Sequence, residues 1–144
     1  MKKIICVLIV LNMFSVYCFS QTVNSKTVTI EITNVVINGG IVYLAVFSNA
    51  QAFRREEPDF SFAIAANNTS IFQSVTLSYG EYVIAAFQDA NGNGIMDSNF
   101  FGIPRELVGI SNYSGRGFPS NNFDRQKIPV GSTTDRITIG LYRF

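Results

Sequence analysis

The chain contains no histidine among its 144 residues. That absence excludes a Ser–His–Asp triad, a histidine general base and any zinc site with a histidine ligand. The sequence also lacks a block of lysine and arginine, and no stripe of alternating basic and aromatic residues occurs. Nucleic acid is therefore not an expected partner.

Cysteine is almost as scarce. The two copies, Cys6 and Cys18, both lie within the first twenty residues. If that segment is removed, the remaining chain has no cysteine and therefore no disulfide. Its stability must then come from its hydrophobic core and from any ion that it binds.

The first twenty residues have the pattern of a signal peptide. A short basic start at residues 1–3 precedes an apolar run at residues 4–19, and small residues lie close to Ser20. We therefore expect residues 1–20 to be a signal peptide and the product to be secreted, periplasmic or on the cell surface. An uncleaved membrane anchor and lipid attachment at Cys18 are the alternatives, and the apolar run is short for a bilayer span.

Alternation of apolar and polar residues dominates the rest of the chain, which is typical of half-buried β-strands. It predicts strands at residues 27–33, 41–47, 71–77, 81–87 and 136–142. Two of these, 41–47 and 81–87, are apolar on both faces, as expected of central strands that are covered on both sides. Asn38-Gly39-Gly40 is a hairpin signal between the first two strands. The residues predicted to face the core are Val28, Ile30, Ile32, Ile71, Val75, Leu77, Ile137, Ile139 and Leu141.

Two segments interrupt the strand pattern. Residues 51–57 have a helical character that Pro58 ends, and we expect a crossover loop there, with Phe53, Phe60 and Phe62 as a small satellite cluster. Residues 89–129 are rich in Gly, Asn, Ser and Pro, and loops of that length are usually functional or held by a ligand. The chain is thus expected to be a single all-β domain, residues 21–144. Its predicted fold is an antiparallel β-sandwich of about seven strands.

One turn in the irregular segment has the spacing of a Ca²⁺-binding loop. Counting Asp89 as position 1, oxygen-bearing side chains occupy positions 3, 5 and 9, and a glycine at position 6 permits the sharp turn. The residues predicted to bind Ca²⁺ are Asp89, Asn91, Asn93, Ile95 through its carbonyl, Asp97 and Glu106.

The loop departs from the full pattern at position 12, where Phe100 replaces the usual bidentate glutamate. Glu106 lies further along the chain and is the candidate to complete the ligand set. We expect weak affinity, with a dissociation constant of about 10⁻⁴–10⁻³ M. The alternative is a plain Asn-Gly turn, because both residues tolerate a left-handed backbone.

A set of short motifs occurs in and around this loop: Gly80–Tyr82, Phe87–Gly94, Asp97, Phe101–Glu106 and Gly109–Asn112. These motifs resemble one family of secreted bacterial proteins, the domain of unknown function numbered twenty-one forty-one. The resemblance implies an Ig-like or prealbumin-like sandwich and implies no established activity. Gln88 stands where that family commonly has histidine, and Leu107 where it has a small or polar residue. The Asp89–Asp97 loop is also similar to the calcium-binding B-type repeats of bacterial adhesins.

These observations favour a non-enzymatic function. We expect a non-enzymatic module that binds a protein or glycan at the cell envelope, with Ca²⁺ ordering its loops. A carbohydrate-active enzyme that uses Asp97 and Glu106 as a carboxylate pair is the first alternative. A purely structural envelope protein is the second. Residues 109–120, rich in hydroxyls and amides, are either a sugar-binding surface or a loop that covers the end of the sandwich.

Overall fold

The computed structural model describes residues 24–144, so the expected signal peptide, residues 1–20, lies outside the described residues. The described part consists of eight strands and two short helices. The strands are β1 (Ser25–Thr33), β2 (Ile41–Phe47), β3 (Phe60–Ala65), β4 (Ser70–Ser78), β5 (Gly80–Asp89), β6 (Leu107–Ile110), β7 (Ile128–Val130) and β8 (Arg136–Gly140). The helices are α1 (Ala50–Arg55) and α2 (Phe123–Gln126).

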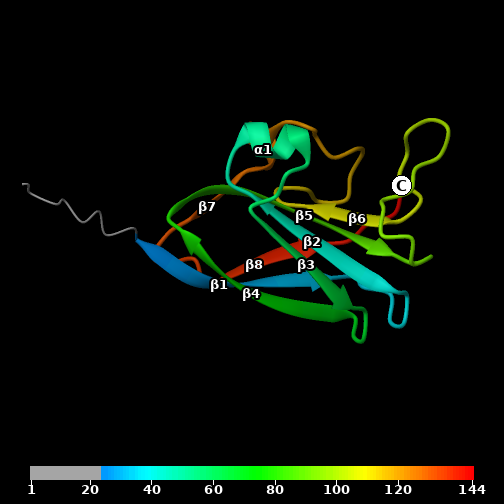
Figure 1. The fold of residues 1–144 in the computed structure, drawn as a ribbon, viewed down its shortest axis with the longest axis horizontal. Coiled ribbons are helices and arrows are strands. Elements are labelled where there is room, and N and C mark those ends of the chain that lie inside the picture. The colour runs from blue at the N-terminus through cyan, green and yellow to red at the C-terminus, as the bar shows by residue number, and fades with distance from the viewer. Residues whose placement is uncertain (1–23) are drawn as a thin grey trace, which may run out of the picture.

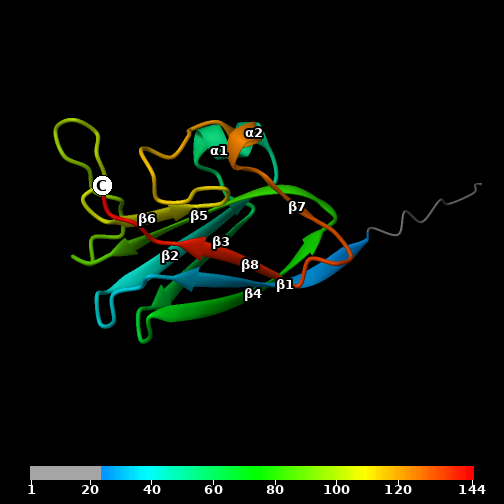
Figure 2. The same ribbon diagram turned by 180° about the vertical axis from the view of Figure 1, so that it is seen from behind.

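The strands form two sheets packed face to face (Figures 1 and 2). The smaller sheet has the order β4-β1-β8, and the larger has the order β3-β2-β5-β6, with β7 paired to the start of β5. The expected all-β sandwich is confirmed, with eight strands rather than about seven. One pairing differs from the antiparallel expectation, because β1 runs parallel to β8.

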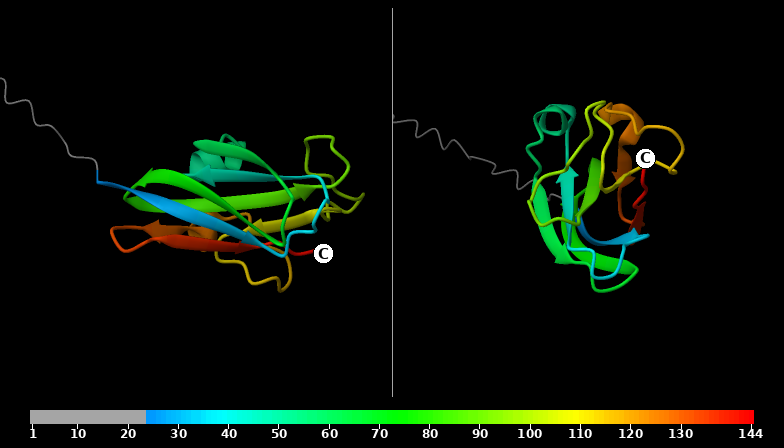
Figure 3. Two further views of the ribbon diagram at one scale, coloured as in Figure 1. Left: turned by 90° about the horizontal axis from the view of Figure 1, so that it is seen from below. Right: turned by 90° about the vertical axis from the view of Figure 1, so that its right-hand side faces the viewer.

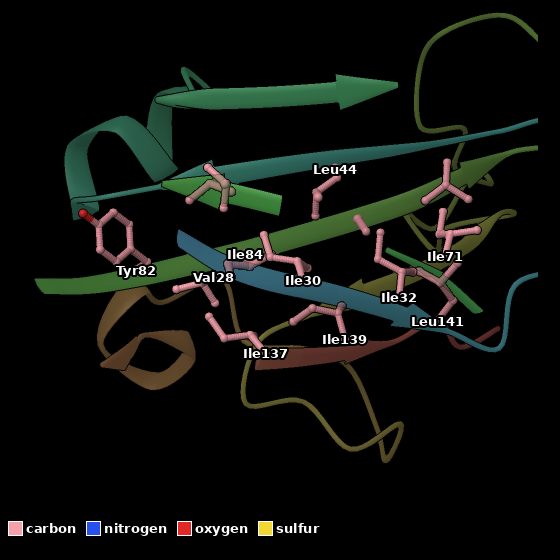
Figure 4. Close-up of a cluster of buried hydrophobic side chains, with 14 of the residues drawn as sticks. Val28, Ile30, Ile32, Leu44, Ile71, Tyr82, Ile84, Ile137, Ile139 and Leu141 are labelled. Carbon is pink, nitrogen blue, oxygen red and sulfur yellow. The ribbon is translucent and has the colours of Figure 1, made fainter. Parts of the chain in front are cut away.

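The hydrophobic core fills the space between the sheets. Figure 4 shows Ile30 of β1 and Ile139 of β8 close to Leu44 and Ile84 of the larger sheet. Each of these four side chains is at most 1% exposed. Every residue predicted to face the core is buried, which confirms the period-2 reading of β1, β4 and β8. Burial of this apolar surface is the main source of stability in a domain of this kind.

The predicted hairpin at Asn38-Gly39-Gly40 is wrong. β1 pairs with β4 and β8, whereas β2 pairs with β3 and β5, so residues 34–40 carry the chain from one sheet to the other. The side chain of Gln88, 3% exposed, holds this connection from below. Gln88 accepts a hydrogen bond from Val36 N at 3.0 Å and donates to the carbonyl oxygens of Val36 and Gly39 at 2.7 and 3.0 Å. The Asn-Gly-Gly residues thus predicted a turn, but they did not predict that the strand after the turn belongs to the other sheet.

The helices lie on the outer face of the larger sheet, the face turned away from the core (Figures 1 and 3). The helical prediction for residues 51–57 is confirmed in α1, which ends at Glu56 in a left-handed cap. The satellite-cluster prediction is wrong for Phe60 and Phe62, because Phe62 of β3 packs against the main core and Phe60 is 40% exposed. No helix within residues 24–144 is long and apolar enough to cross a membrane.

Candidate functional site

The outer face of the larger sheet carries a furrow that follows directly from the strand register. Tyr43 pairs with Phe87 across β2 and β5, and their rings stack with centroids 5.1 Å apart. Two residues along each strand, Ala45 pairs with Ala85, and Ser61 of β3 extends this row of small side chains. Small side chains beside a bulky row leave space above the sheet.

A second bulky row closes the furrow on its other side. Phe47 pairs with Val83, and both are buried although they face away from the core. Phe53 of α1 packs edge-on against Phe47 with centroids 5.3 Å apart, and its ring lies 6.3 Å from that of Phe123 in α2. Rows on one face of a strand are separated by about 7 Å, so the two bulky rows lie about 13 Å apart.

Two loops raise the remaining walls. Residues 96–104 contribute Met96 and Pro104, and residues 113–121 contribute Tyr113 and Phe118. The second loop is anchored by Ser111, whose hydroxyl accepts a hydrogen bond from Ile84 N and donates to the Gln126 carbonyl at 2.6 Å. We call the resulting hollow, from Phe47 to Pro104 above the Ala45–Ala85 row, the trench.

The trench has the size and chemistry of a small-molecule site. Its volume is about 820 Å³, within the usual range of about 300–1,000 Å³ for ligand pockets. Alanine, aromatic and other apolar side chains make most of its lining, and Glu56 is the one charged side chain among the described residues that line it. Such a lining suits an apolar molecule that carries no negative charge.

The predicted Ca²⁺ loop borders the trench. Asp89, at its start, is 1% exposed and accepts hydrogen bonds from Gly92 N and Gly94 N, each at 2.7 Å. Burial raises the pKa of this carboxyl, but the backbone N–H groups of Gly94, Gly92, Asn93 and Asn91 together outweigh that effect and hold its pKa below the ordinary value. Gly94 approaches the trench, because a Cβ there would lie 3.8 Å from the hydroxyl oxygen of Tyr43.

Three of the predicted Ca²⁺ ligands converge. Asn91 Nδ2 and Asn93 Nδ2 donate to the same Asp97 oxygen at 2.6 and 3.0 Å. Asn91 Oδ1 accepts from Asn93 N, and Asn93 Oδ1 accepts from Ile95 N, each at 3.0 Å. The loop thus folds around one centre, and hydrogen bonds occupy the side-chain oxygens of Asn91 and Asn93 and one oxygen of Asp97.

Another predicted ligand, Glu106, lies beneath the loop and is 6% exposed. Its carboxylate accepts hydrogen bonds from Ala90 N at 3.2 Å and Asp97 N at 3.3 Å, so it joins the two ends of the loop. This position favours a structural role for Glu106 over a catalytic one. Within residues 24–144, no group of three or more His, Cys, Asp or Glu side chains is placed to hold a metal.

Sequence reasoning missed the trench, although a signal for it was present. The apolar outward faces of residues 41–47 and 81–87 were attributed to covering layers on both sides. The structure covers only the ends of those strands, with α1 and with residues 90–106, and leaves the middle open. The small residues Ala45 and Ala85, one on each strand, mark the open part.

The fold and the trench together define a class: an all-β sandwich with an apolar hollow on the outer face of its larger sheet. The chain belongs to the family described as an uncharacterized protein conserved in bacteria (DUF2141), whose model matches residues 30–138. The match begins in β1 and ends in β8, so it includes both sheets and the loops around the trench. No curated protein and no solved structure matches the chain.

Proposed function

We propose that this domain is a non-enzymatic binding module that holds an elongated, uncharged apolar molecule in the trench. The supporting observation is the row of small residues, Ala45 and Ala85, between the bulky rows of Tyr43 and Phe47. An outer sheet face with no ligand to hold would be expected to carry polar side chains. The aromatic and aliphatic side chains that line the trench instead favour a surface that a bound ligand covers.

The apolar lining also makes a glycan, one of the two partners expected from the sequence, a poor fit for the trench. A glycan would need many hydrogen-bonding groups, whereas Ser61, Ser120 and Asn121 are the few neutral amide and serine side chains along the trench. An apolar ligand gains about 25 cal/mol for each Å² that it buries. We also propose that the protein is exported from the cytoplasm, as the signal-peptide pattern of residues 1–20 predicts.

Filling the floor of the trench tests this function. Ala85→Leu adds three carbon atoms where the ligand would lie, so we expect it to weaken binding of the neutral fluorescent probe N-phenylnaphthylamine by at least about tenfold. Fluorescence titration measures the affinity. Ala65→Leu is the matched control. Ala65, in β3, is exposed on the same outer face of the larger sheet as Ala85, but it does not line the trench.

Two results would contradict the proposal. One is absence of probe binding by the unmodified domain, and the other is equal affinity of the domain and the Ala85→Leu variant. Thermal unfolding of both variants provides the folding control. Ala85 faces away from the core, so we expect the melting temperatures to change little.

Calcium binding by the loop is a second candidate function, supported by the convergence of Asn91, Asn93 and Asp97 on one centre. Turning the two amides would direct their oxygens toward that centre, where Asp97 supplies a carboxylate. Ca²⁺ prefers such oxygen ligands. The same loop contributes Met96 to the trench, so an ion would stiffen one wall of the ligand site.

Calorimetric titration tests the calcium candidate. At ten times a dissociation constant of about 1 mM, Ca²⁺ should stabilise the domain by about 1.4 kcal/mol. Asp97→Asn should abolish both the heat and the stabilisation, because it removes the one carboxylate at the centre. Asp124→Asn, at a carboxylate in α2 whose side chain is 76% exposed, is the control. No heat and no shift in melting temperature at millimolar Ca²⁺ would eliminate this candidate.

A further inference from the structure

The most exposed apolar side chains of the described chain are adjacent. Phe100 is 97% exposed and Phe101 is 83% exposed, at the tip of the loop between β5 and β6. Their rings meet edge to face with centroids 5.6 Å apart. Figures 1 and 2 show this loop projecting from one end of the sandwich. We call this pair of residues the aromatic tip.

The backbone of the aromatic tip forms its own hydrogen bonds. Asn99 Oδ1 accepts from Phe101 N at 2.9 Å and from Ile103 N at 3.0 Å. Asn99 also donates its N–H to the Ile103 carbonyl and accepts from Gly102 N. At the base of the turn, Arg105 N donates to the Asp97 carbonyl. The N–H groups of Asn99, Phe101, Gly102 and Ile103 thus have partners within the turn, which lowers the cost of removing the turn from water.

The loop carries further exposed apolar side chains, and two arginines lie near its base. Ile95 and Met96 are 62% and 52% exposed on the same loop. Behind them, Arg143 Nη1 lies 3.4 Å from the Arg105 carbonyl, so two exposed arginines lie together at this end of the molecule. Neither arginine has a carboxylate within ion-pair distance among residues 24–144.

We propose that the aromatic tip inserts into the interface of a lipid bilayer that contains anionic headgroups. Phe100 and Phe101 enter the boundary between headgroups and acyl chains, and Arg105 and Arg143 contact the phosphates. This order of apolar and basic groups matches the order of layers in a membrane surface. The inference goes beyond ligand binding, because the aromatic tip does not line the trench.

A lipid surface fits the tip better than a protein partner does. A protein pocket would recognise a particular shape and supply hydrogen bonds to the loop, whereas the tip turn already makes its own. The two most exposed aromatic side chains also lie at the end of the turn that Gly102 N and the Asn99 carbonyl close, as expected of a group that enters a membrane interface. Attraction of Arg105 and Arg143 to anionic lipid predicts that salt weakens the binding.

A single tryptophan tests insertion directly, because the chain contains no tryptophan. Phe100→Trp places a reporter at the tip, and Phe72→Trp places one on the exposed face of the smaller sheet, where Phe72 is 54% exposed. With vesicles of phosphatidylcholine and phosphatidylglycerol, emission from position 100 should shift to shorter wavelength and be quenched by brominated acyl chains. Emission from position 72 should not change.

Co-sedimentation with the same vesicles measures the affinity. The double variant Phe100→Ser/Phe101→Ser should lower the bound fraction by at least about tenfold, since two aromatic side chains no longer enter the interface. Phe72→Ser is the matched control and should bind as the unmodified domain does. Circular dichroism verifies that each variant is folded.

An unshifted emission at position 100, or equal sedimentation of the double variant and the unmodified domain, would overturn the membrane proposal. A partner protein at the tip would give that result. Ala85→Leu should lose probe binding and keep full vesicle binding. Absence of probe binding by the unmodified domain would count against the ligand proposal and leave the membrane proposal intact.

Discussion

At the scale of single residues, Asp89 is a buried charge that backbone N–H groups stabilise. Its carboxylate accepts hydrogen bonds from Gly92 N and Gly94 N, both in the loop that begins at Asp89. Hydrogen bonds to a charged acceptor are shorter and stronger than those between neutral groups. They lower the pKa of Asp89, although burial opposes this effect.

This pKa gives the stability of the domain a defined pH dependence. A carboxyl whose pKa is lower in the folded state than its unfolded value of about 3.9 contributes stability above that value. The contribution is lost as the pH falls through the folded-state pKa. Asp89→Asn should therefore be less stable than the unmodified domain at pH 7, and the difference should shrink on acidification below pH about 4.

Urea denaturation at neutral and acidic pH, with a chelator present, measures this effect without a contribution from Ca²⁺. Asp124→Asn is the control, since its exposed side chain should contribute little to stability at either pH. A constant difference between Asp89→Asn and the unmodified domain at both pH values would show that the charge of Asp89 is not responsible.

At the scale of elements, the contact between β6 and β8 depends on the absence of a side chain. Gly109 of β6 faces the smaller sheet, and a Cβ there would overlap the Gly140 carbonyl and lie 2.9 Å from Ile139 Cγ2. Just beyond, Val108 and Tyr142 exchange backbone hydrogen bonds at 2.9 and 2.8 Å. The end of the chain therefore joins the two sheets along one side of the sandwich.

Adding one methyl group at this contact tests its tightness. Gly109→Ala should destabilise the domain by about 1–3 kcal/mol, because backbone at Gly140 cannot give way as a flexible side chain would. Gly131→Ala should change stability by less than about 0.5 kcal/mol, since nothing lies within 4 Å of a Cβ there. Denaturant midpoints compare the two, and equal effects would mean that β6 and β8 have room to separate.

At the scale of the whole molecule, the larger sheet has two apolar faces with different tasks. One face, with Leu44 and Ile84, packs in the core, and the other, with Ala45 and Ala85, lines the floor of the trench. Successive residues of a strand point to opposite faces, so a single β2–β5 pair supplies both surfaces. Substitutions at Ala45 and Ala85 should consequently alter the proposed ligand binding with little effect on stability.

The proposed sites occur at one end and one face of the sandwich. The loop of Asp89–Asp97 supplies Met96 to the lining of the trench, and the same connection continues to the aromatic tip at Phe100 and Phe101. A membrane contact at the tip would bring the trench close to a source of apolar molecules. The two proposals nevertheless depend on different residues and have separate tests.

Local sequence patterns were sufficient to predict much of the fold. Alternation placed Val28, Ile30 and Ile32 correctly in the core, because side-chain direction in a strand depends only on the backbone pleat. Spacing between Asp89 and Asp97 predicted a curled loop whose Asn91 and Asn93 side chains meet Asp97, since such curling is a local property of the chain.

Pairing between distant segments had to come from the tertiary structure. Nothing in residues 34–40 specifies that β1 and β2 belong to different sheets, because that choice depends on how all the strands share one core. Likewise, Ala45 and Ala85 are ordinary alanines until the β2–β5 register places them side by side between bulkier rows. The sequence by itself determined β1, β2, β4, β5 and β8 and the buried faces of β1, β4 and β8. The short strands β3, β6 and β7 and the trench depend on contacts between residues far apart along the chain, and only the tertiary structure decided them.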